Sequence, residues 1–217
     1  MSSTRVLRHN GIIPGETPNK KRFPIRRPLF YYITDRSSLK TPDEVSLLRQ
    51  IRKLISRGID FIQIREKDLT DRRLFELTRR VVEIARNTRC RILVNGRADI
   101  AITAGADGVH LASSDPGISD IRAWIPKEFI VGVSVHNMRE IRAACAGGAD
   151  YALLGHIFPT PSKEGMGEPL GIGFLERACR KASVPVLALG GITADCAPAI
   201  LETGAAGIAG IRLFQGR

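Results

Sequence analysis

Short apolar runs alternate with longer segments of helical periodicity along most of this chain. The apolar runs are continuous rather than alternating, which is typical of strands buried on both faces of a parallel sheet. Eight of them are expected as strands, at residues 30–33, 61–64, 92–94, 108–111, 130–135, 151–157, 184–189 and 207–213.

Between these runs, apolar residues recur with the three- and four-residue spacing of amphipathic helices. The residues on one face of the segment DRRLFELTRRVVEIARNT are Leu74, Leu77, Val81, Ile84 and Ala85. Helix boundaries are also indicated, because Asp43 and Thr70 stand where N-caps belong and Gly58 follows the first helix as a C-terminal cap.

The stretches AGADGVHL, GGADYALLG and TGAAGIAGI repeat one order: a helix end, a glycine, small residues and then a strand. Eight strand–helix units in one domain predict an α/β fold, a single (β/α)8 TIM barrel rather than an open doubly wound sheet. The chain ends four residues after the eighth expected strand, so the final helix is expected to be short or missing. The N-terminal extension or a partner subunit would then cover the flank between the first and last strands, which suggests a homo-oligomer.

The composition indicates a cytoplasmic globular protein. The chain has 217 residues, of which 43% are hydrophobic and 25% charged. It lacks both a membrane-spanning apolar run and the apolar core of a signal peptide. Its four cysteines are scattered, which favours reduced thiols over a disulfide framework or a zinc site.

The net charge of +11 raises nucleic acid as a partner, but its distribution argues against one. Residues 1–28 carry seven Lys or Arg and one Glu, so this segment holds +6 and the remaining chain +5. The segment is polar, rich in proline and without aromatic interleaving. We expect a flexible, disordered basic extension over 1–28 and the barrel over 29–217, with nucleic acid binding unlikely.

A parallel barrel carries its site at the C-terminal ends of the strands. In the stretch FIQIREKD the second expected strand ends in Arg65, Glu66 and Lys67. We interpret the two cations as half of an anion site, with Glu66 orienting its neighbours. Gly190 and Gly191, after the seventh strand, could offer bare backbone N–H groups to a phosphate, although packing explains such a pair about as well.

The loop FPTPSKEGMGEPLG after the sixth strand has the composition of a mobile lid. It offers the hydroxyls of Thr160 and Ser162 and the cation Lys163 within four residues. Among the histidines, His110 lies within an expected interior strand and is interpreted as a hydrogen-bonded core residue.

Six ordered motifs then identify a family. The stretches YYITDR, QIREKDL, VNGRADIAITAGADGVHL, GVSVHN, GHIFPTPSKEG and ALGGIT resemble, over about residues 29–213, the thiamine phosphate synthase/TenI family. The resemblance implies the same barrel fold and a Mg²⁺-assisted transferase. Such an enzyme joins hydroxymethylpyrimidine diphosphate to thiazole phosphate and releases diphosphate.

The resemblance also implies roles for individual residues. Those matching positions that hold the pyrimidine diphosphate are Gln63, Arg65, Lys67, Asn95, Ser134 and Lys163. Those matching positions around the thiazole and its phosphate are Thr160, Ser162, Gly171 and Gly191. Of the two family metal carboxylates, nineteen residues apart, the second is present as Asp115 and the first is replaced by Gly96, which implies a weakened Mg²⁺ site.

This departure leaves alternatives open. The stretch VNGRAD resembles the TenI branch, whose activity is metal-free thiazole phosphate tautomerisation, with His136 as the acid/base group. A tautomerase binds a single phosphate and has no need for Arg65, Lys67 and Lys163 together, so the synthase is preferred. A non-catalytic phosphate-binding barrel is the third alternative.

Overall fold

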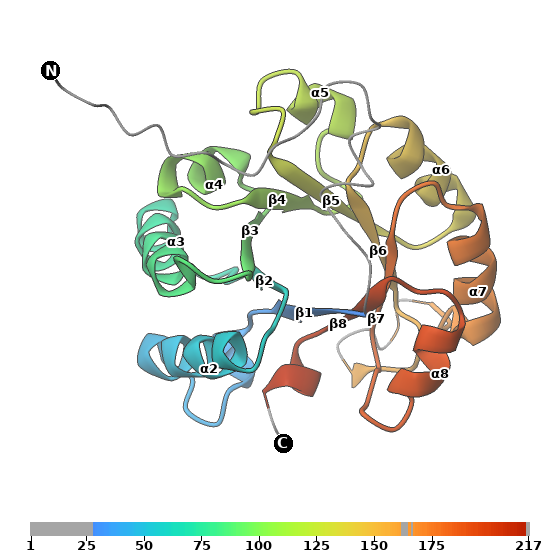
Figure 1. Ribbon diagram of the computed structural model, residues 1–217, viewed down its shortest axis with the longest axis horizontal. Helices are drawn as coiled ribbons and strands as arrows, with labels where there is room; N and C mark the ends of the chain where they lie inside the picture. The colour runs from blue at the N-terminus through green and yellow to red at the C-terminus, as the bar shows by residue number, and fades with distance from the viewer. Residues whose placement is uncertain (1–27, 162–164, 166, 216–217) are drawn as a thin grey trace, which may run out of the picture.

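The computed structural model describes residues 28–161, 165 and 167–215, and these form the expected (β/α)8 barrel (Figure 1). Eight parallel strands pair in sequence order, and β1 also pairs with β8, which closes the sheet. The strands are β1 (Leu29–Ile33), β2 (Phe61–Ile64), β3 (Arg91–Asn95), β4 (Gly108–Leu111), β5 (Ile130–Val135), β6 (Tyr151–Gly155), β7 (Val186–Leu189) and β8 (Gly207–Gly210). The basic extension predicted over 1–28 lies, apart from its last residue, outside the described residues.

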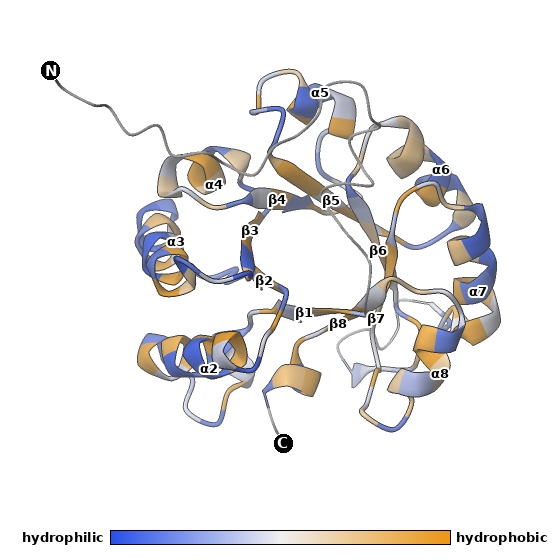
Figure 2. Ribbon diagram, viewed as in Figure 1, coloured by the Kyte–Doolittle hydropathy of each residue, from blue (hydrophilic) through white to orange (hydrophobic). Residues whose placement is uncertain are grey.

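Helices surround the barrel and turn their apolar faces toward it (Figure 2). They are α2 (Glu44–Ser56), α3 (Asp71–Ala85), α4 (Ala98–Ala104), α5 (Ile118–Arg122), α6 (Met138–Ala146), α7 (Gly171–Lys181) and α8 (Ala197–Glu202), with short 3-10 turns η1 (Arg36–Ser38) and η3 (Arg212–Phe214). The expected caps are confirmed: the Asp43 side chain accepts from a backbone N–H of α2, the Thr70 side chain does so in α3, and Gly58 follows α2 with φ +81°. On α3 the predicted face is buried, except that Ile84 is only half-buried.

Three strands are shorter than predicted. Residues 184–185 precede β7 because Pro185 has no N–H to donate to a ladder. β6 pairs with β7 as far as Gly155, and the chain then leaves the sheet to form the loop that follows. β8 ends at Gly210, so Arg212, expected at its end, lies instead in the turn η3.

Inward-facing residues fill the barrel with a separate apolar cluster, which includes Tyr31, Phe61, Leu93, Tyr151 and Leu153. The larger cluster lies between the strands and the helices. This two-layer burial explains the continuous apolar runs in the sequence, because both faces of each strand are covered. Among the described residues, no helix is long and apolar enough to cross a membrane.

Gly132 makes the barrel interior wide enough for Tyr151. A Cβ atom at position 132 would lie 1.9 Å from Cζ of the Tyr151 ring, a distance that no packing allows. We therefore expect Gly132→Ala to push the ring from its place and to lower the free energy of unfolding by about 2 kcal/mol. Chemical denaturation checks this, with Gly173→Ala on α7 as the control, because a Cβ there has its nearest neighbour at 3.7 Å. Equal stability of the two variants would contradict the packing argument.

The C-terminal turn covers the flank between β1 and β8. The Phe214 ring packs edge-on against Phe30 and Tyr32, with ring centroids 6.5 and 6.2 Å apart. The Gln215 side chain then donates to the Tyr32 hydroxyl and to the Asp35 carbonyl oxygen. Among the described residues, the element that follows β8 is this 3-10 turn, η3. Residues 212–215 therefore cover part of the flank between β1 and β8, which the N-terminal extension or a partner subunit was expected to cover. Association into a homo-oligomer stays a prediction.

Candidate functional site

Three residues expected to contact substrate lie together at the mouth of the barrel. Gln63 lies on β2, Asn95 is the last residue of β3, and Ser134 lies on β5. Gln63 is buried, whereas Asn95 and Ser134 are half-buried. The Gln63 Nε2 group donates to Asn95 Oδ1 at 2.8 Å, so these two amides form one polar surface.

A chain of hydrogen bonds through the barrel interior joins this pair to Ser134. The Tyr31 hydroxyl donates to Gln63 Oε1 at 3.0 Å and lies 2.8 Å from the Tyr151 hydroxyl. His110 Nδ1 lies 2.9 Å from the Tyr151 oxygen, and His110 Nε2 lies 2.9 Å from Ser134 Oγ. We call these side chains, together with Asn95, the buried polar chain. It places one hydrogen-bonding end at Asn95 and the other at Ser134.

His110 is neutral within this chain. Burial, and secondly the positive charge of Arg65, lower the pKa of His110 to about 3. Both ring nitrogens are hydrogen-bonded, so the interpretation of His110 as a core histidine is confirmed. Tyr31 and Tyr151 were not predicted at the site, although their inward position follows from the period-two pattern of the strands.

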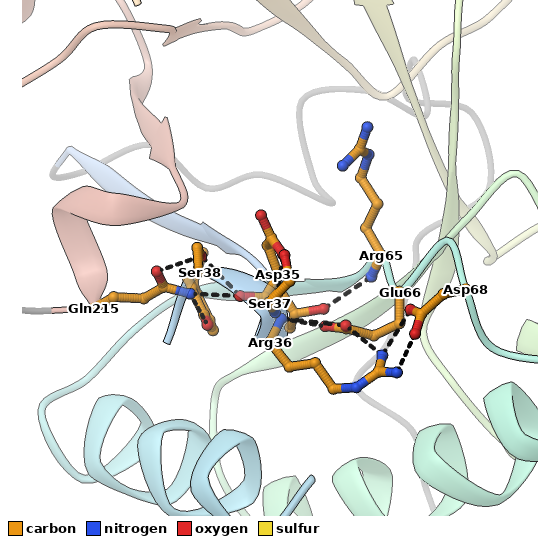
Figure 3. A network of polar contacts seen from close by, with 10 residues as sticks. Asp35, Arg36, Ser37, Ser38, Arg65, Glu66, Asp68 and Gln215 are labelled. Carbon is orange, nitrogen blue, oxygen red and sulfur yellow. Dashed lines mark hydrogen bonds and ion pairs between the residues drawn. The ribbon is translucent and has the colours of Figure 1, made fainter. Parts of the chain in front are cut away.

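A second network lies on the rim between β1 and β2 (Figure 3). The buried Glu66 carboxylate accepts from the Arg36 backbone N–H at 3.2 Å and from Arg36 Nη1 at 2.9 Å. Arg36 also pairs with the exposed Asp68. Glu66 was expected to orient its neighbours Arg65 and Lys67; it binds Arg36 instead, because the side chains of 65 and 66, just after β2, point in opposite directions (Figure 3).

Arg65 lies outside this network, apart from its backbone. Its backbone N–H donates to Thr34 Oγ1 at 2.9 Å, which fixes the start of the loop. Its guanidinium points away from the Arg36–Glu66 pair in Figure 3 and is close enough to His110 to lower that pKa. No carboxylate in the described part of the chain pairs with it. Lys67 is exposed on the same loop.

Arg97, another cation at a strand end, is neutralised. Its guanidinium binds both oxygens of Asp99 and also pairs with Asp71. Among the described residues at this rim, Arg36 and Arg97 thus bind carboxylates and Arg65 does not.

Asp115 and Gly96 face one another. A Cβ atom at position 96 would lie 3.5 Å from Asp115 Oδ2, so the two positions of the family metal pair are adjacent here. Asp115 Oδ2 accepts from the Ala112 backbone N–H at 2.7 Å. Among the residues that the structure describes, no three Asp, Glu, His or Cys side chains gather as a complete metal site.

The glycines after β7 have a packing role. A Cβ at Gly190 would lie 2.5 Å from the His156 Cβ, and one at Gly191 would lie 2.6 Å from the Pro159 carbonyl oxygen. Because neither glycine has a Cβ, the end of β7 can approach the loop after β6 this closely, and both residues have positive φ angles, which also favour glycine. Gly171, the first residue of α7, donates its N–H to the Ile157 carbonyl oxygen.

The loop after β6, expected to be a mobile lid, is described only in part. Thr160 is half-buried at its start, whereas Ser162 and Lys163 lie outside the described residues. On the neighbouring strand, His136 follows β5, and its Nδ1 lies 3.1 Å from Glu140 Oε2 on α6. With Nδ1–H donating to this carboxylate, Nε2 is the nitrogen left to exchange a proton.

Comparison with known proteins agrees with this geometry. The family model for thiamine monophosphate synthase matches residues 30–214. A thiamine-phosphate synthase of Clostridium novyi is 36% identical over 178 residues, 82% of this chain and 86% of that protein. One from Roseiflexus castenholzii is 34% identical over 203 residues, covering 94% and 88% respectively.

A solved structure gives the same result. The thiamine phosphate pyrophosphorylase from Pyrococcus furiosus superposes with a TM-score of 0.78 at 31% identity and covers 91% of both chains. The expectation drawn from the six sequence motifs is therefore confirmed. The chain belongs to the thiamine monophosphate synthase family.

Proposed function

We infer that this chain is a thiamine-phosphate synthase, a transferase that joins hydroxymethylpyrimidine diphosphate to thiazole phosphate and releases diphosphate. Membership of the family supports the activity. The observation that supports this site most is the position of the Arg65 guanidinium. It lies near the buried polar chain and has no carboxylate partner among the described residues. An unpaired cation beside amide and hydroxyl groups is suited to an anionic ligand.

The proposed site residues assist cleavage of the bond between the pyrimidine CH₂ group and the diphosphate oxygen. As the pyrimidine CH₂–O bond opens, its electron pair moves to the diphosphate oxygen, where negative charge accumulates. Arg65, Lys67, Asn95 and Lys163 would stabilise that charge more in the transition state than in the ground state. The lone pair of the thiazole nitrogen then forms the new C–N bond to the cationic carbon. No side chain has to remove a proton in this sequence.

A magnesium ion fits the site with one protein carboxylate. Asp115 would hold it, and the diphosphate oxygens would complete its coordination, because Mg²⁺ commonly binds through one or two carboxylates and substrate phosphates. When bound, the ion supplies positive charge to the leaving diphosphate. The glycine at position 96 leaves room beside Asp115 where the family carries a second carboxylate.

Gly96→Asp tests this arrangement. The Cβ of the new side chain would lie 3.5 Å from Asp115 Oδ2, and aspartate tolerates the left-handed backbone at this position, φ +66°, better than most residues do. We expect the Mg²⁺ concentration for half-maximal activity to fall about tenfold. Gly96→Asn has the same shape without the charge and is the control. If both variants shift the magnesium requirement equally, the gain does not come from a carboxylate pair.

The alternative is thiazole phosphate tautomerisation with His136 as the acid/base group. The fixed orientation of His136 by Glu140 favours it, since Nε2 is left free to carry the proton. The same position also suits a rim residue that only stabilises the start of α6.

One assay separates the alternatives. Purified protein is mixed with hydroxymethylpyrimidine diphosphate, thiazole phosphate and Mg²⁺, and thiamine phosphate is measured. The synthase predicts product that needs both substrates and survives His136→Ala. Tautomerisation of the thiazole precursor that His136→Ala abolishes, without thiamine phosphate, would overturn the synthase. Binding of both ligands without either reaction would indicate a non-catalytic barrel.

A further inference from the structure

The chain contains two Asn–Gly pairs, Asn10–Gly11 and Asn95–Gly96, and the second lies at the candidate site. Asparagine followed by glycine is the pair most prone to deamidation, because glycine has no side chain to hinder attack of its backbone nitrogen on the asparagine amide. Asn95 is the last residue of β3 and is half-buried, and Gly96 is exposed in the turn that follows. Water therefore reaches this pair in the folded protein.

The reaction at such a pair needs water as its only co-reactant. The Gly96 nitrogen gives its proton to solvent and forms a bond to Asn95 Cγ, and the side-chain nitrogen leaves as ammonia, so that a cyclic imide results. Water then breaks one of the two imide C–N bonds. Cleavage at Cγ gives aspartate, and cleavage at the backbone carbonyl gives isoaspartate. In both products a carboxylate has replaced the neutral amide.

Two hydrogen bonds at this pair have opposite effects on the reaction. The Gln63 Nε2 group donates to Asn95 Oδ1 at 2.8 Å. Negative charge accumulates on this oxygen when the Gly96 nitrogen attacks Cγ, so the Gln63 donor stabilises the transition state. The Gly96 N–H, in contrast, donates to the His110 carbonyl oxygen at 2.8 Å, and this bond has to open before the nitrogen can attack.

The bond that has to open lies at the end of the ladder between β3 and β4. Asn95 and His110 are the last paired residues in the register of these strands. Hydrogen bonds at the end of a ladder open locally, without unfolding of the barrel. The net contribution of one hydrogen bond corresponds to about a tenfold change in an opening equilibrium. Global unfolding, in contrast, is disfavoured by more than about 10³-fold in a stable domain.

We propose that Asn95–Gly96 is a site of spontaneous deamidation, which opens at the end of β3 and converts the protein into a form that no longer binds diphosphate. The product lacks the Nδ2 donors of Asn95 and places a negative charge where the anionic ligand would bind, and like charges repel. Isoaspartate also lengthens the backbone by one carbon, which displaces Gly96 from its place beside Asp115. The loss of diphosphate binding rests on the proposed function, whereas the modification itself does not.

The test follows deamidation in the full-length protein during incubation in mildly alkaline buffer, with a parallel sample in urea for the rate in the unfolded chain. Tryptic peptides 92–97 and 9–20 report the two Asn–Gly pairs separately, by mass and by isoaspartate content. Asn10–Gly11 is the internal reference for buffer and temperature. Calorimetry with inorganic diphosphate and Mg²⁺ measures binding at each time.

Gly96→Ala is the matched variant. A Cβ at this position has Asp115 Oδ2 as its nearest neighbour at 3.5 Å, so there is room for it, and it hinders attack by the backbone nitrogen. We expect it to suppress conversion at Asn95 and to leave conversion at Asn10 unchanged. If the positive φ angle at position 96 prevents this variant from folding, protection of the wild-type protein by diphosphate supplies the same comparison.

We expect conversion at Asn95 to be about tenfold slower in the native protein than in urea. Inorganic diphosphate with Mg²⁺, at about ten times its dissociation constant, should slow it by about a further tenfold without affecting Asn10. Diphosphate binding should be lost in proportion to conversion.

Two results would overturn the proposal. One is a native rate at Asn95 more than about 10³-fold below the rate in urea, because conversion would then require global unfolding. The other is conversion at Asn95 without loss of diphosphate binding. Conversion at the expected rate in a wild-type protein that never binds diphosphate would leave the modification standing and reject the proposed function alone.

Discussion

Arg65→Met is expected to lower kcat/KM for thiamine phosphate formation by between about 10² and 10³-fold. The reason is that the Arg65 guanidinium has no described carboxylate partner and lies at the barrel mouth, close enough to His110 to affect its pKa. Its charge is therefore available to the departing diphosphate. Stability should change by less than about 0.5 kcal/mol, because the substitution removes no ion pair of the described residues. Steady-state kinetics and chemical denaturation measure the two quantities.

Arg97→Met is the matched control. Arg97 also follows a strand at this rim, but Asp71 and Asp99 already neutralise its charge. We expect kcat/KM to change less than threefold. A similar loss of activity in both variants would mean that the net charge of the rim, rather than the position of Arg65, supports the reaction.

An independent measurement locates the Arg65 guanidinium. Burial is the main cause that lowers the pKa of His110, and the charge of Arg65 is the second. In Arg65→Met the second cause is removed, so the pKa of His110 should rise toward its ordinary value, whereas Arg97→Met should leave it unchanged. Titration of the histidine ring signals by NMR reads this directly. If the pKa of His110 is the same in Arg65→Met as in the wild-type protein, the Arg65 guanidinium lies away from the buried polar chain.

The sequence predicted the barrel because the relevant signals are local. Continuous apolar runs, the caps Asp43 and Thr70, and repeated glycines before strands each depend on a few neighbouring residues. The strand ends were less predictable. The apolar run 151–157 continues past Gly155 because the loop after β6 is also buried at Ile157, and apolarity alone does not separate a strand from a buried loop.

The site was predicted in part, again because local signals are readable in the sequence and contacts between distant residues are not. Residues at strand ends are recognisable, so Gln63, Asn95 and Ser134 could be named and do lie near one another. Which cation binds which carboxylate was not predictable, because Arg36 and Glu66 are thirty residues apart and meet only when β1 and β2 pair. The tyrosines of the buried polar chain were missed because their hydroxyls meet across the barrel.

Arg36→Met is expected to destabilise the fold by about 3 kcal/mol while leaving diphosphate binding largely intact. Glu66 has only 2% of its side chain exposed, and Arg36 Nη1 is its charged partner at 2.9 Å. Removing the guanidinium leaves a buried carboxylate without a compensating charge. Denaturant unfolding measures the loss, and calorimetry with inorganic diphosphate measures binding.

The control for this stability effect is Arg72→Met. Arg72 pairs with Glu76 on the surface of α3, with 88% of its side chain exposed, and such pairs contribute at most about 1 kcal/mol. A second comparison is the double variant Arg36→Met with Glu66→Leu, which removes the buried charge as well and should recover part of the loss. If the double variant is no more stable than Arg36→Met alone, the destabilisation comes from lost packing of the arginine side chain. The ion pair between Arg36 and Glu66 would then contribute little to stability. Recovery together with intact diphosphate binding would establish that Arg36 and Arg65 have separate roles, Arg36 in stabilising the fold and Arg65 in binding the ligand.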